Sequence, residues 1–169
     1  MDNKNTKQIT YTALMAALVC VATFLIKIPS LNGYTHLGDC MIFVSVLILG
    51  RRNGALAGGI GVALADLLGG YMQWIIPTFF IKAIMALIMG LIAEKVFPKL
   101  KFGWLIGAVA GGIFQIIGYT LVKIPLYGMG YAMTSLPVLT MQTISGIVIA
   151  FVIVTALLQT KIIRKAKEI

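Results

Sequence analysis

The sequence predicts an all-α integral membrane protein, a bundle of six transmembrane helices, and three observations lead to this fold class. Hydrophobic residues make up 60% of the chain and charged residues 11%, whereas soluble domains carry about 25% charged residues. The mean hydropathy is +1.00. Long apolar segments alternate with short polar or basic turns. A soluble protein could not cover its surface with so few charges, so we expect one membrane domain covering residues 1–169.

Six apolar segments account for the predicted helices. The first follows Lys4 and Lys7, is longer than the roughly 7–15-residue apolar core of a signal peptide, and has no A-x-A cleavage motif behind it. We therefore expect it to be retained as a membrane helix. The fourth begins at Pro77, a residue suited to the first position of a helix. The expected helices cover residues 9–26, 40–50, 54–68, 77–93, 102–122 and 136–159.

Segments 40–50 and 54–68 are short and are joined by the basic turn at residues 51–53. At about 1.5 Å per residue, neither spans the hydrocarbon core comfortably. Non-helical backbone at membrane depth is tolerated only where it is buried in protein or lines a cavity. We therefore expect the outer loops beside these segments to fold into the bundle and roof an outward-facing cavity.

The basic residues set the expected orientation in the bilayer. An even number of helices places both termini on the same side. All of the 14 Lys and Arg residues except Lys27, Lys82 and Lys123 lie in the termini and turns of that side. This distribution follows the positive-inside rule, so both termini are expected in the cytoplasm. It also explains the net charge of +9 without a nucleic-acid partner.

The sequence gives no sign of an enzyme, a cofactor or a metal site. The single histidine, His36, has no nucleophile beside it, and no pair of carboxylates shares a helix face. A GxxxxGK[ST] phosphate-binding loop is absent. Cys20 and Cys40 lack metal-type spacing and fit small apolar packing residues. Any uphill transport must therefore take its energy from a partner or from an ion gradient.

The polar side chains of the predicted bundle gather in its outer half. This placement favours a one-ended pocket, because a water-filled channel needs polar residues along its whole depth. Aromatic rings with a few donors and acceptors suit a small, flat, polar heterocycle. The candidate substrate-binding residues are Asp66, Tyr71, Trp74, Lys82, Gln115, Tyr119, Lys123 and Tyr127, with Asn32, Tyr34, His36 and Asp39 from the first loop. The same half also holds Gln73, Gln142 and Ser145.

Asp66 and Lys82 are the charges that the apolar segments themselves contain around the Gly-Gly turn. An ionisable residue in a membrane segment costs free energy unless it is paired or faces a polar cavity. Both lie roughly 5–8 Å below the outer ends of consecutive antiparallel helices. Two interpretations follow, a structural ion pair that fixes the hairpin or a contact to a polar or anionic ligand group. The two overlap, because a ligand could insert into the pair.

Small residues four positions apart mark three helix faces. In lipid, such faces allow close backbone approach and supply packing energy. The faces in segments 54–68 and 102–122 are expected to pack inside the bundle. Ala13 and Ala17 of the first helix lie near its cytoplasmic end, with Thr6 and Thr10 on about the same face. That face is a candidate for docking another membrane protein.

Three stretches carry a resemblance to a known family. They are the opening TYTALMAALVCVATFL, the run GYTHLGDCMIFVSVLILGRRNGALAGGIGVALADLLGGY and the following PTFFIKAIMALIMGLIAE. Together with size and helix number, they resemble an S component, the substrate-capture subunit, of an energy-coupling factor (ECF) vitamin transporter. The pattern is most similar to the branch with riboflavin-type subunits and those assigned to hydroxymethylpyrimidine or pyridoxine.

The resemblance implies high-affinity vitamin binding at the outer face of a bacterial plasma membrane, under a lid formed here by residues 29–38. It also implies that Ala13 and Ala17 dock the transmembrane coupling subunit, and that two cytoplasmic ATPase subunits drive the cycle. Pyridoxine or hydroxymethylpyrimidine is the expected substrate, with riboflavin as the alternative. A stand-alone transporter driven by an ion gradient and an inert membrane scaffold are the competing interpretations.

Overall fold

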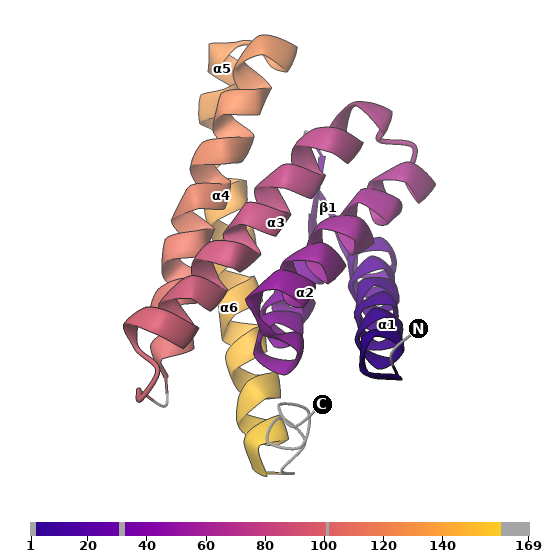
Figure 1. The fold of residues 1–169 in the computed structure, drawn as a ribbon. Coiled ribbons are helices and arrows are strands. Elements are labelled where there is room, and N and C mark those ends of the chain that lie inside the picture. The colour runs from indigo at the N-terminus through magenta and orange to yellow at the C-terminus, as the bar shows by residue number, and fades with distance from the viewer. Residues whose placement is uncertain (1–2, 31–32, 101, 160–169) are drawn as a thin grey trace.

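The computed structural model describes residues 3–30, 33–100 and 102–159, and these residues form an almost entirely helical bundle (Figure 1). Asn32 lies outside the described residues. In chain order the elements are α1 (Asn3–Leu25), β1 (Lys27–Ser30), β2 (Gly33–His36), α2 (Gly38–Leu68), the 3-10 turn η1 (Met72–Trp74), α3 (Ile75–Leu91), the π-helical turn η2 (Ile92–Val96), α4 (Gly103–Tyr127), α5 (Met129–Thr134) and α6 (Leu136–Gln159).

Within the described residues, five helices are long and apolar enough to cross a membrane. One of them, α2, contains both segments 40–50 and 54–68. Gly50 interrupts it with a φ of 79°, a conformation that glycine adopts without a steric penalty. A Cβ on Gly54 would lie 2.5 Å from the Val46 Cα, and one on Gly58 would lie 2.8 Å from the Ile42 side chain. The two arms of α2 therefore fold back on each other, while the count of six spanning helices stays a prediction.

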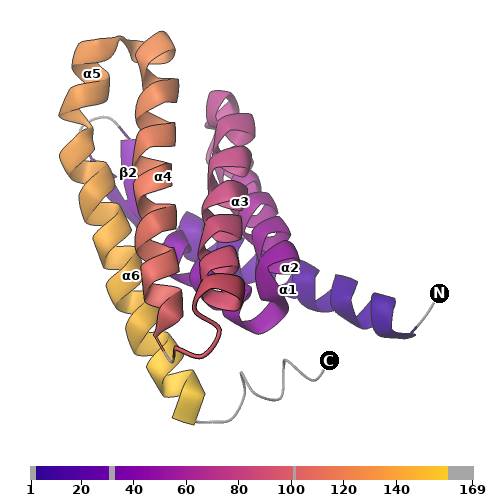
Figure 2. The ribbon, with the colours of Figure 1, turned by 60° about the vertical axis from the view of Figure 1, so that its left-hand side comes forward.

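The helices pack in sequence order and close onto α6. α1 packs on α2, α2 on α3 and α3 on α4, while α6 lies against both α2 and α4 (Figures 1 and 2). The glycines of α4 make this packing close, because Cβ atoms on Gly107 and Gly111 would lie 2.5 and 2.6 Å from the carbonyl oxygens of Met89 and Met85. The small-residue face of α4 is thus an internal contact with α3, as helix packing in lipid favours.

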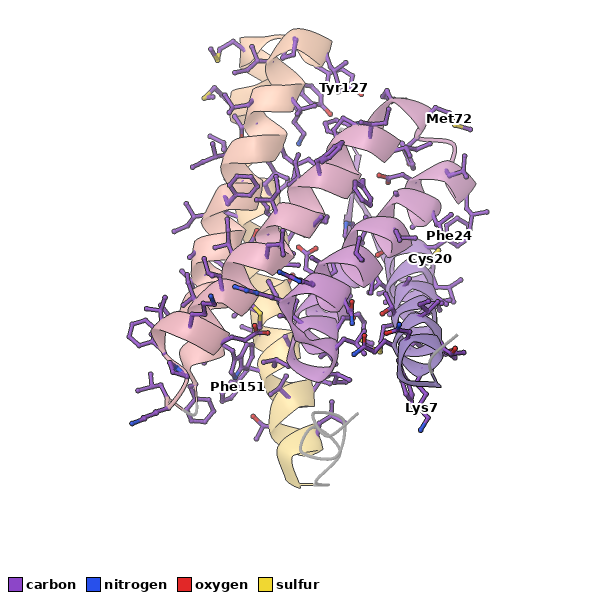
Figure 3. All side chains as sticks on the ribbon, in the orientation of Figure 1. Lys7, Cys20, Phe24, Met72, Tyr127 and Phe151 are labelled. Atoms are coloured by element: carbon purple, nitrogen blue, oxygen red, sulfur yellow. The ribbon has the colours of Figure 1, made fainter. Side chains whose placement is uncertain are left out.

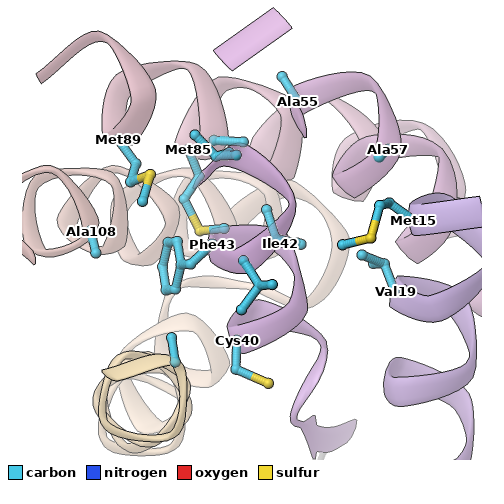
Figure 4. Packing of buried hydrophobic residues seen from close by; sticks show 14 of the residues in the cluster. Met15, Val19, Cys40, Ile42, Phe43, Ala55, Ala57, Met85, Met89 and Ala108 are labelled. Atoms are coloured by element: carbon cyan, nitrogen blue, oxygen red, sulfur yellow. The ribbon is translucent and has the colours of Figure 1, made fainter. Parts of the chain in front are cut away.

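The apolar core lies where α2 meets α1, α3, α4 and α6. Phe43 of α2 is fully buried next to Met85, Met89 and Ala108, and Met15 approaches from α1 (Figure 4). Unbranched methionines fill the irregular gaps between helices of unequal tilt. Large apolar side chains project outward around the bundle (Figure 3). This pattern of apolar residues inside and outside fits a bundle surrounded by lipid.

Two local structures differ from the expectation of helices joined by loops. The loop after α1 contains two short antiparallel strands in which Lys27 pairs with His36 and Ser30 with Gly33, a small addition to a fold of the predicted helical class. The predicted loop at residues 123–135 is mostly helical, since α4 continues to Tyr127 with Pro125 inside it and α5 follows. Pro125 has no N–H to donate to the Leu121 carbonyl oxygen, so the last turn of α4 lacks one backbone hydrogen bond.

Two ends of the bundle can be told apart. η1 and α5 lie toward the top of Figure 1, and we call this the cavity end. The start of α1, the turn after α3 and the end of α6 lie toward the bottom. We call this the basic end because Lys95 lies in η2 and Lys99 just after it, and Arg51, next to Arg52, pairs with Glu94 of η2. Figure 3 places Tyr127 and Met72 at the cavity end and Lys7 toward the basic end.

Candidate functional site

A cavity of about 290 Å³ lies at the cavity end, between β2, the end of α2, η1, α3, α4 and α6. Its volume is at the lower limit of small-molecule pockets, which hold about 300–1,000 Å³. The cavity is lined by His36, Asp66, Tyr71, Gln73, Trp74, Thr78, Tyr119, Lys123, Tyr127, Leu139 and Gln142.

Aromatic rings form one wall of the cavity. The Trp74 ring lies 5.7 Å from the Tyr119 ring at an angle of 53°, and 6.2 Å from the Tyr127 ring at 27°. Tyr127 also contacts Tyr131 at 4.8 Å, and its hydroxyl accepts a hydrogen bond from the Gln73 amide at 3.3 Å. Helix α4 supplies the rings of Tyr119 and Tyr127, about two helical turns apart. η1 places Trp74 against both of them. Such a wall offers ring faces for stacking a flat heterocycle.

Below the cavity, a buried network centres on Lys82 of α3. Its ammonium donates to Asp39 and to the Gln115 carbonyl oxygen, both at 2.5 Å, and lies 5.3 Å from the centre of the Tyr119 ring. The Gln115 amide nitrogen donates to Asp39 at 3.0 Å and to the Thr143 hydroxyl at 2.6 Å. Lys82 and Asp39 are 0% exposed. A buried ion pair persists only when further hydrogen bonds satisfy both partners, and this network supplies them.

Asp39 also connects the network to the cavity wall. The Gln142 amide nitrogen lies 3.3 Å from an Asp39 carboxylate oxygen and 3.4 Å from His36 Nε2. His36 Nδ1 accepts the backbone N–H of Gly38 at 3.1 Å. Asp39 lies in the first turn of α2, where the helix dipole favours a negative charge. Helices α2, α3, α4 and α6 thus meet at one carboxylate.

Most of the predicted binding residues come together, in two layers. Seven of them line the cavity, namely His36, Asp66, Tyr71, Trp74, Tyr119, Lys123 and Tyr127. Lys82, Gln115 and Asp39 lie outside the lining, in the network. For Tyr34, the structure describes the backbone in β2 and not the side chain. Whether these residues bind a substrate stays a prediction.

Lys82 has a different ion-pair partner from the one considered in the sequence. Its salt bridge is to Asp39, 43 positions earlier in the chain, and not to Asp66. The consecutive helices α2 and α3 do pack together, but Lys82 faces inward to the start of α2 and to α4. Asp66 instead lines the cavity, 4% exposed. The structural pair and the cavity carboxylate are therefore separate features.

Four lining residues were not among the candidates. Gln73 and Gln142 belonged to the outer polar half, but an amide alone gave no reason to prefer them over other polar residues. Thr78 and Leu139 gave no signal, because a threonine and a leucine in apolar helices are ordinary packing residues. The clue that could have found Gln142 is its neighbour Thr143, since two polar residues in succession are unusual in the middle of a membrane helix.

The donors and acceptors of the cavity suit an organic ligand more than a metal ion. Among the described residues, no three His, Cys, Asp or Glu side chains gather as a metal site. The cavity instead combines a carboxylate, an imidazole, amides, a hydroxyl and the ammonium of Lys123. This mixture can pair with both donors and acceptors on the edge of a ring that stacks on the aromatic wall.

The small-residue face of α1 points away from the bundle. Ala13, Ala17, Thr6 and Thr10 are all exposed, whereas Ala16 and Val19 are buried against Gly61 of α2. The Thr10 hydroxyl donates to the carbonyl oxygen of Thr6 at 2.9 Å, so it needs no other partner in lipid. The face is smooth and able to approach another helix closely.

Comparison with known proteins identifies similar sequences. A family model described as "ECF-type riboflavin transporter, S component" matches residues 3–159. The chain is 37% identical over 133 residues to a Pyrococcus woesei protein described as "Uncharacterized protein in gap 3'region", which covers 78% of this chain and 88% of that protein. It is 31% identical over 156 residues to the thiamine precursor transporter HmpT of Lactococcus lactis subsp. cremoris, which covers 90% of this chain and 89% of that protein.

Proposed function

Because the chain belongs to the family of ECF-type riboflavin transporter S components, we propose that it captures hydroxymethylpyrimidine, a thiamine precursor, or the similar heterocycle pyridoxine. Membership of this family makes it a multi-pass membrane component of a vitamin transporter. The observation that carries the proposal is the cavity, in which the aromatic wall of Trp74, Tyr119 and Tyr127 stands beside the polar groups of Asp66 and Gln142.

The size of the cavity favours a single small ring over riboflavin. At about 290 Å³ it is compact, and a three-ring isoalloxazine with a ribityl chain needs more room than one substituted pyrimidine or pyridine. The relative from Lactococcus lactis carries the name thiamine precursor transporter, which supports the same choice. Riboflavin remains the second candidate, because the matching family model is described by that vitamin.

The proposed orientation places the cavity at the outer face. The basic end carries Arg51, Arg52, Lys95 and Lys99, and the positive-inside rule assigns such an end to the cytoplasm. Six spanning helices with both termini inside are part of this proposal, as is a bacterial plasma membrane. Capture from outside then explains why polar residues are concentrated at one end of the bundle.

Delivery to the cytoplasm is proposed to require a transmembrane coupling subunit and two ATPase subunits. The exposed face of Ala13 and Ala17 is the proposed docking surface on this chain. Its small side chains allow close helix contact, and its position on α1 leaves the cavity open to ligand. The sequence contains no GxxxxGK[ST] ATP-binding loop, so an ATP-driven cycle would need partner subunits.

The substrate is tested by purifying the protein from growing cells and identifying the bound small molecules by mass spectrometry. We expect hydroxymethylpyrimidine or pyridoxine in near-stoichiometric amount. Bound riboflavin would support the second candidate. Recovery of protein without any bound heterocycle, together with no binding after these compounds are added back, would contradict vitamin capture.

The docking surface is tested by Ala13→Trp, which places a bulky ring on the exposed face of α1. We expect ligand binding to stay at the wild-type level and cellular uptake to fall by at least tenfold. The matched control is Ile113→Trp on the lipid-facing side of α4, where 54% of the residue is exposed, and uptake should persist. Normal uptake by Ala13→Trp, or uptake in cells that lack the coupling and ATPase subunits, would overturn the docking assignment.

A further inference from the structure

Asp39, a buried residue that does not line the cavity, bears on which hydrogen-bonding groups the cavity presents to a ligand. Asp39 is 0% exposed and is not among the lining residues. Among the described residues, every group that hydrogen-bonds to its carboxylate is a donor, namely Lys82 at one oxygen and the amide nitrogens of Gln115 and Gln142 at the other. An ionised carboxylate only accepts hydrogen bonds. Asp39 therefore fixes which atoms of its neighbours are turned toward it.

Gln115 and Gln142 differ in what holds their amides. The Gln115 amide is fixed twice, because its oxygen accepts from Lys82 while its nitrogen donates to Asp39 and Thr143. For Gln142, the nitrogen faces the Asp39 carboxylate at 3.3 Å. A flipped amide would place the Gln142 oxygen against that carboxylate, acceptor against acceptor. Asp39 therefore favours the orientation in which the Gln142 nitrogen faces its carboxylate and the amide oxygen is turned away from it.

This orientation decides what Gln142 presents to a ligand. One hydrogen of the amide nitrogen is directed to Asp39, which leaves the other hydrogen and the amide oxygen. Among the described residues, none donates to that oxygen. Gln142, which lines the cavity, thus offers an amide acceptor beside an amide N–H donor.

We infer that Asp39 is a positioning residue for substrate selection: it orients Gln142 so that the cavity selects a heterocycle with an exocyclic amine next to a ring nitrogen. The amine donates to the Gln142 oxygen, and the ring nitrogen accepts from the second N–H of the Gln142 amide. Glutamine reads the same edge of adenine in nucleic-acid recognition. This inference rests on the proposed function and narrows it to an aminopyrimidine, so it favours hydroxymethylpyrimidine over pyridoxine.

The experiment measures the affinities of two probes for the purified full-length protein. One is 4-amino-5-hydroxymethyl-2-methylpyrimidine, and the other is the same compound with hydrogen in place of the 4-amino group. The wild-type protein should prefer the amine by about tenfold, the loss expected when one hydrogen bond leaves a buried acceptor unpaired. Gln142→Leu should abolish this preference, so that the two probes bind with about equal affinity. Asp39→Asn should reduce the preference as well, because an asparagine amide both donates and accepts and therefore does not fix the orientation of Gln142.

Two controls separate selection from general damage. Trp74→Phe weakens ring stacking, so it should lower both affinities and leave their ratio unchanged. Thr140→Val changes an exposed residue of α6 and should leave both affinities unchanged. If Asp39→Asn does not fold, Gln142→Leu decides alone. A wild-type tenfold preference that survives in Gln142→Leu would overturn the inference while leaving the proposed function intact. Binding of pyridoxine with no binding of either pyrimidine probe would overturn the inference alone, whereas no binding of either probe or of pyridoxine would overturn the proposed function as well.

Discussion

Within the part of the chain that the structure describes, two ion pairs have opposite surroundings, one below the cavity and one at the basic end. Lys82 and Asp39 lie below the cavity with side chains 0% exposed, 2.5 Å apart and embedded in further hydrogen bonds. Arg51 and Glu94 lie at the basic end, 3.7 Å apart, with side chains 25% and 42% exposed. Removing one member should be costly in the first pair, where the remaining charge is buried, and mild in the second, where water and headgroups solvate it.

The two pairs also have different tasks. Glu94 accepts the backbone N–H of Arg51 at 2.8 Å, directly after the Gly50 interruption, so it helps to cap the second arm of α2. The Asp39 carboxylate of α2 instead gathers side chains from three other helices, α3, α4 and α6, around the base of the cavity. The comparison indicates that the surface pair supports a local turn, whereas the buried pair determines how the helices meet at the candidate site.

The largest effect is expected for Lys82→Met. This change leaves the Asp39 carboxylate buried without its ammonium, so we expect the protein to lose about 3–5 kcal/mol of stability. The measurement is the midpoint of unfolding in detergent, with ligand affinity determined on the folded fraction. Since Lys82 lies outside the cavity lining, the loss of stability should exceed the loss of binding free energy.

The double variant Lys82→Met, Asp39→Leu is the control for this prediction. It removes both charges and should recover much of the lost stability, because no uncompensated charge remains. A Lys82→Met protein as stable as the wild type, but with binding abolished, would instead place Lys82 in direct contact with the ligand.

A smaller effect is expected for Gly146→Ala, which disturbs the buried pair without removing a charge. The new Cβ would lie 2.8 Å from the Cβ of Asp39, so the start of α2 and α6 must move apart. Overpacking of this kind costs about 1–3 kcal/mol. Gly130→Ala is the matched control, because nothing lies within 4 Å of a Cβ there. Equal unfolding midpoints for the two variants would show that Asp39 is not held tightly by α6.

The smallest effect is expected for Glu94→Ala at the basic end. It removes a half-exposed ion pair and one acceptor for a helix N–H, and together these are worth about 1 kcal/mol. Glu94→Gln keeps an oxygen for the Arg51 N–H, so its loss should be smaller still. The unfolding midpoints of both variants check this order, and a Glu94→Ala loss as large as that of Lys82→Met would remove the contrast between the two ends.

Hydropathy and charge placement predicted the membrane class and the positions of most long helices, because burial in lipid constrains composition along every segment, and the resemblance of three stretches predicted the family. The cavity lining was also largely predictable, since Asp66, Trp74 and Tyr119 are expensive or conspicuous at their depth. The ion-pair partner of Lys82 could not be predicted from the sequence. The Lys82–Asp39 pair joins residues 43 positions apart, and it depends on which face of each helix turns inward. That choice follows from packing contacts such as Gly146 on Asp39, which no local pattern records.

The short elements between the long helices were also not predicted from the sequence. Hydropathy treats residues 27–36 and 123–135 as polar loops, yet the structure forms the β1–β2 pair in the first and continues α4 into α5 in the second. The strand pair and the helical segment each form their backbone hydrogen bonds within the segment itself. Average hydropathy over a window of sequence does not detect such local hydrogen bonding. These elements matter for the site, because His36 ends β2 and Tyr127 ends α4, and both line the cavity.

The most direct test of the central claim is a fluorescence titration, because one of the two tryptophans lies in the cavity wall. Trp74 lines the cavity, whereas Trp104 is 4% exposed in the apolar core. In a Trp104→Phe protein, hydroxymethylpyrimidine should change the Trp74 fluorescence in a saturable way, with one site and higher affinity than riboflavin. No saturable change with hydroxymethylpyrimidine or pyridoxine, or tighter binding of riboflavin than of either, would contradict the assignment of this cavity to a small single-ring vitamin.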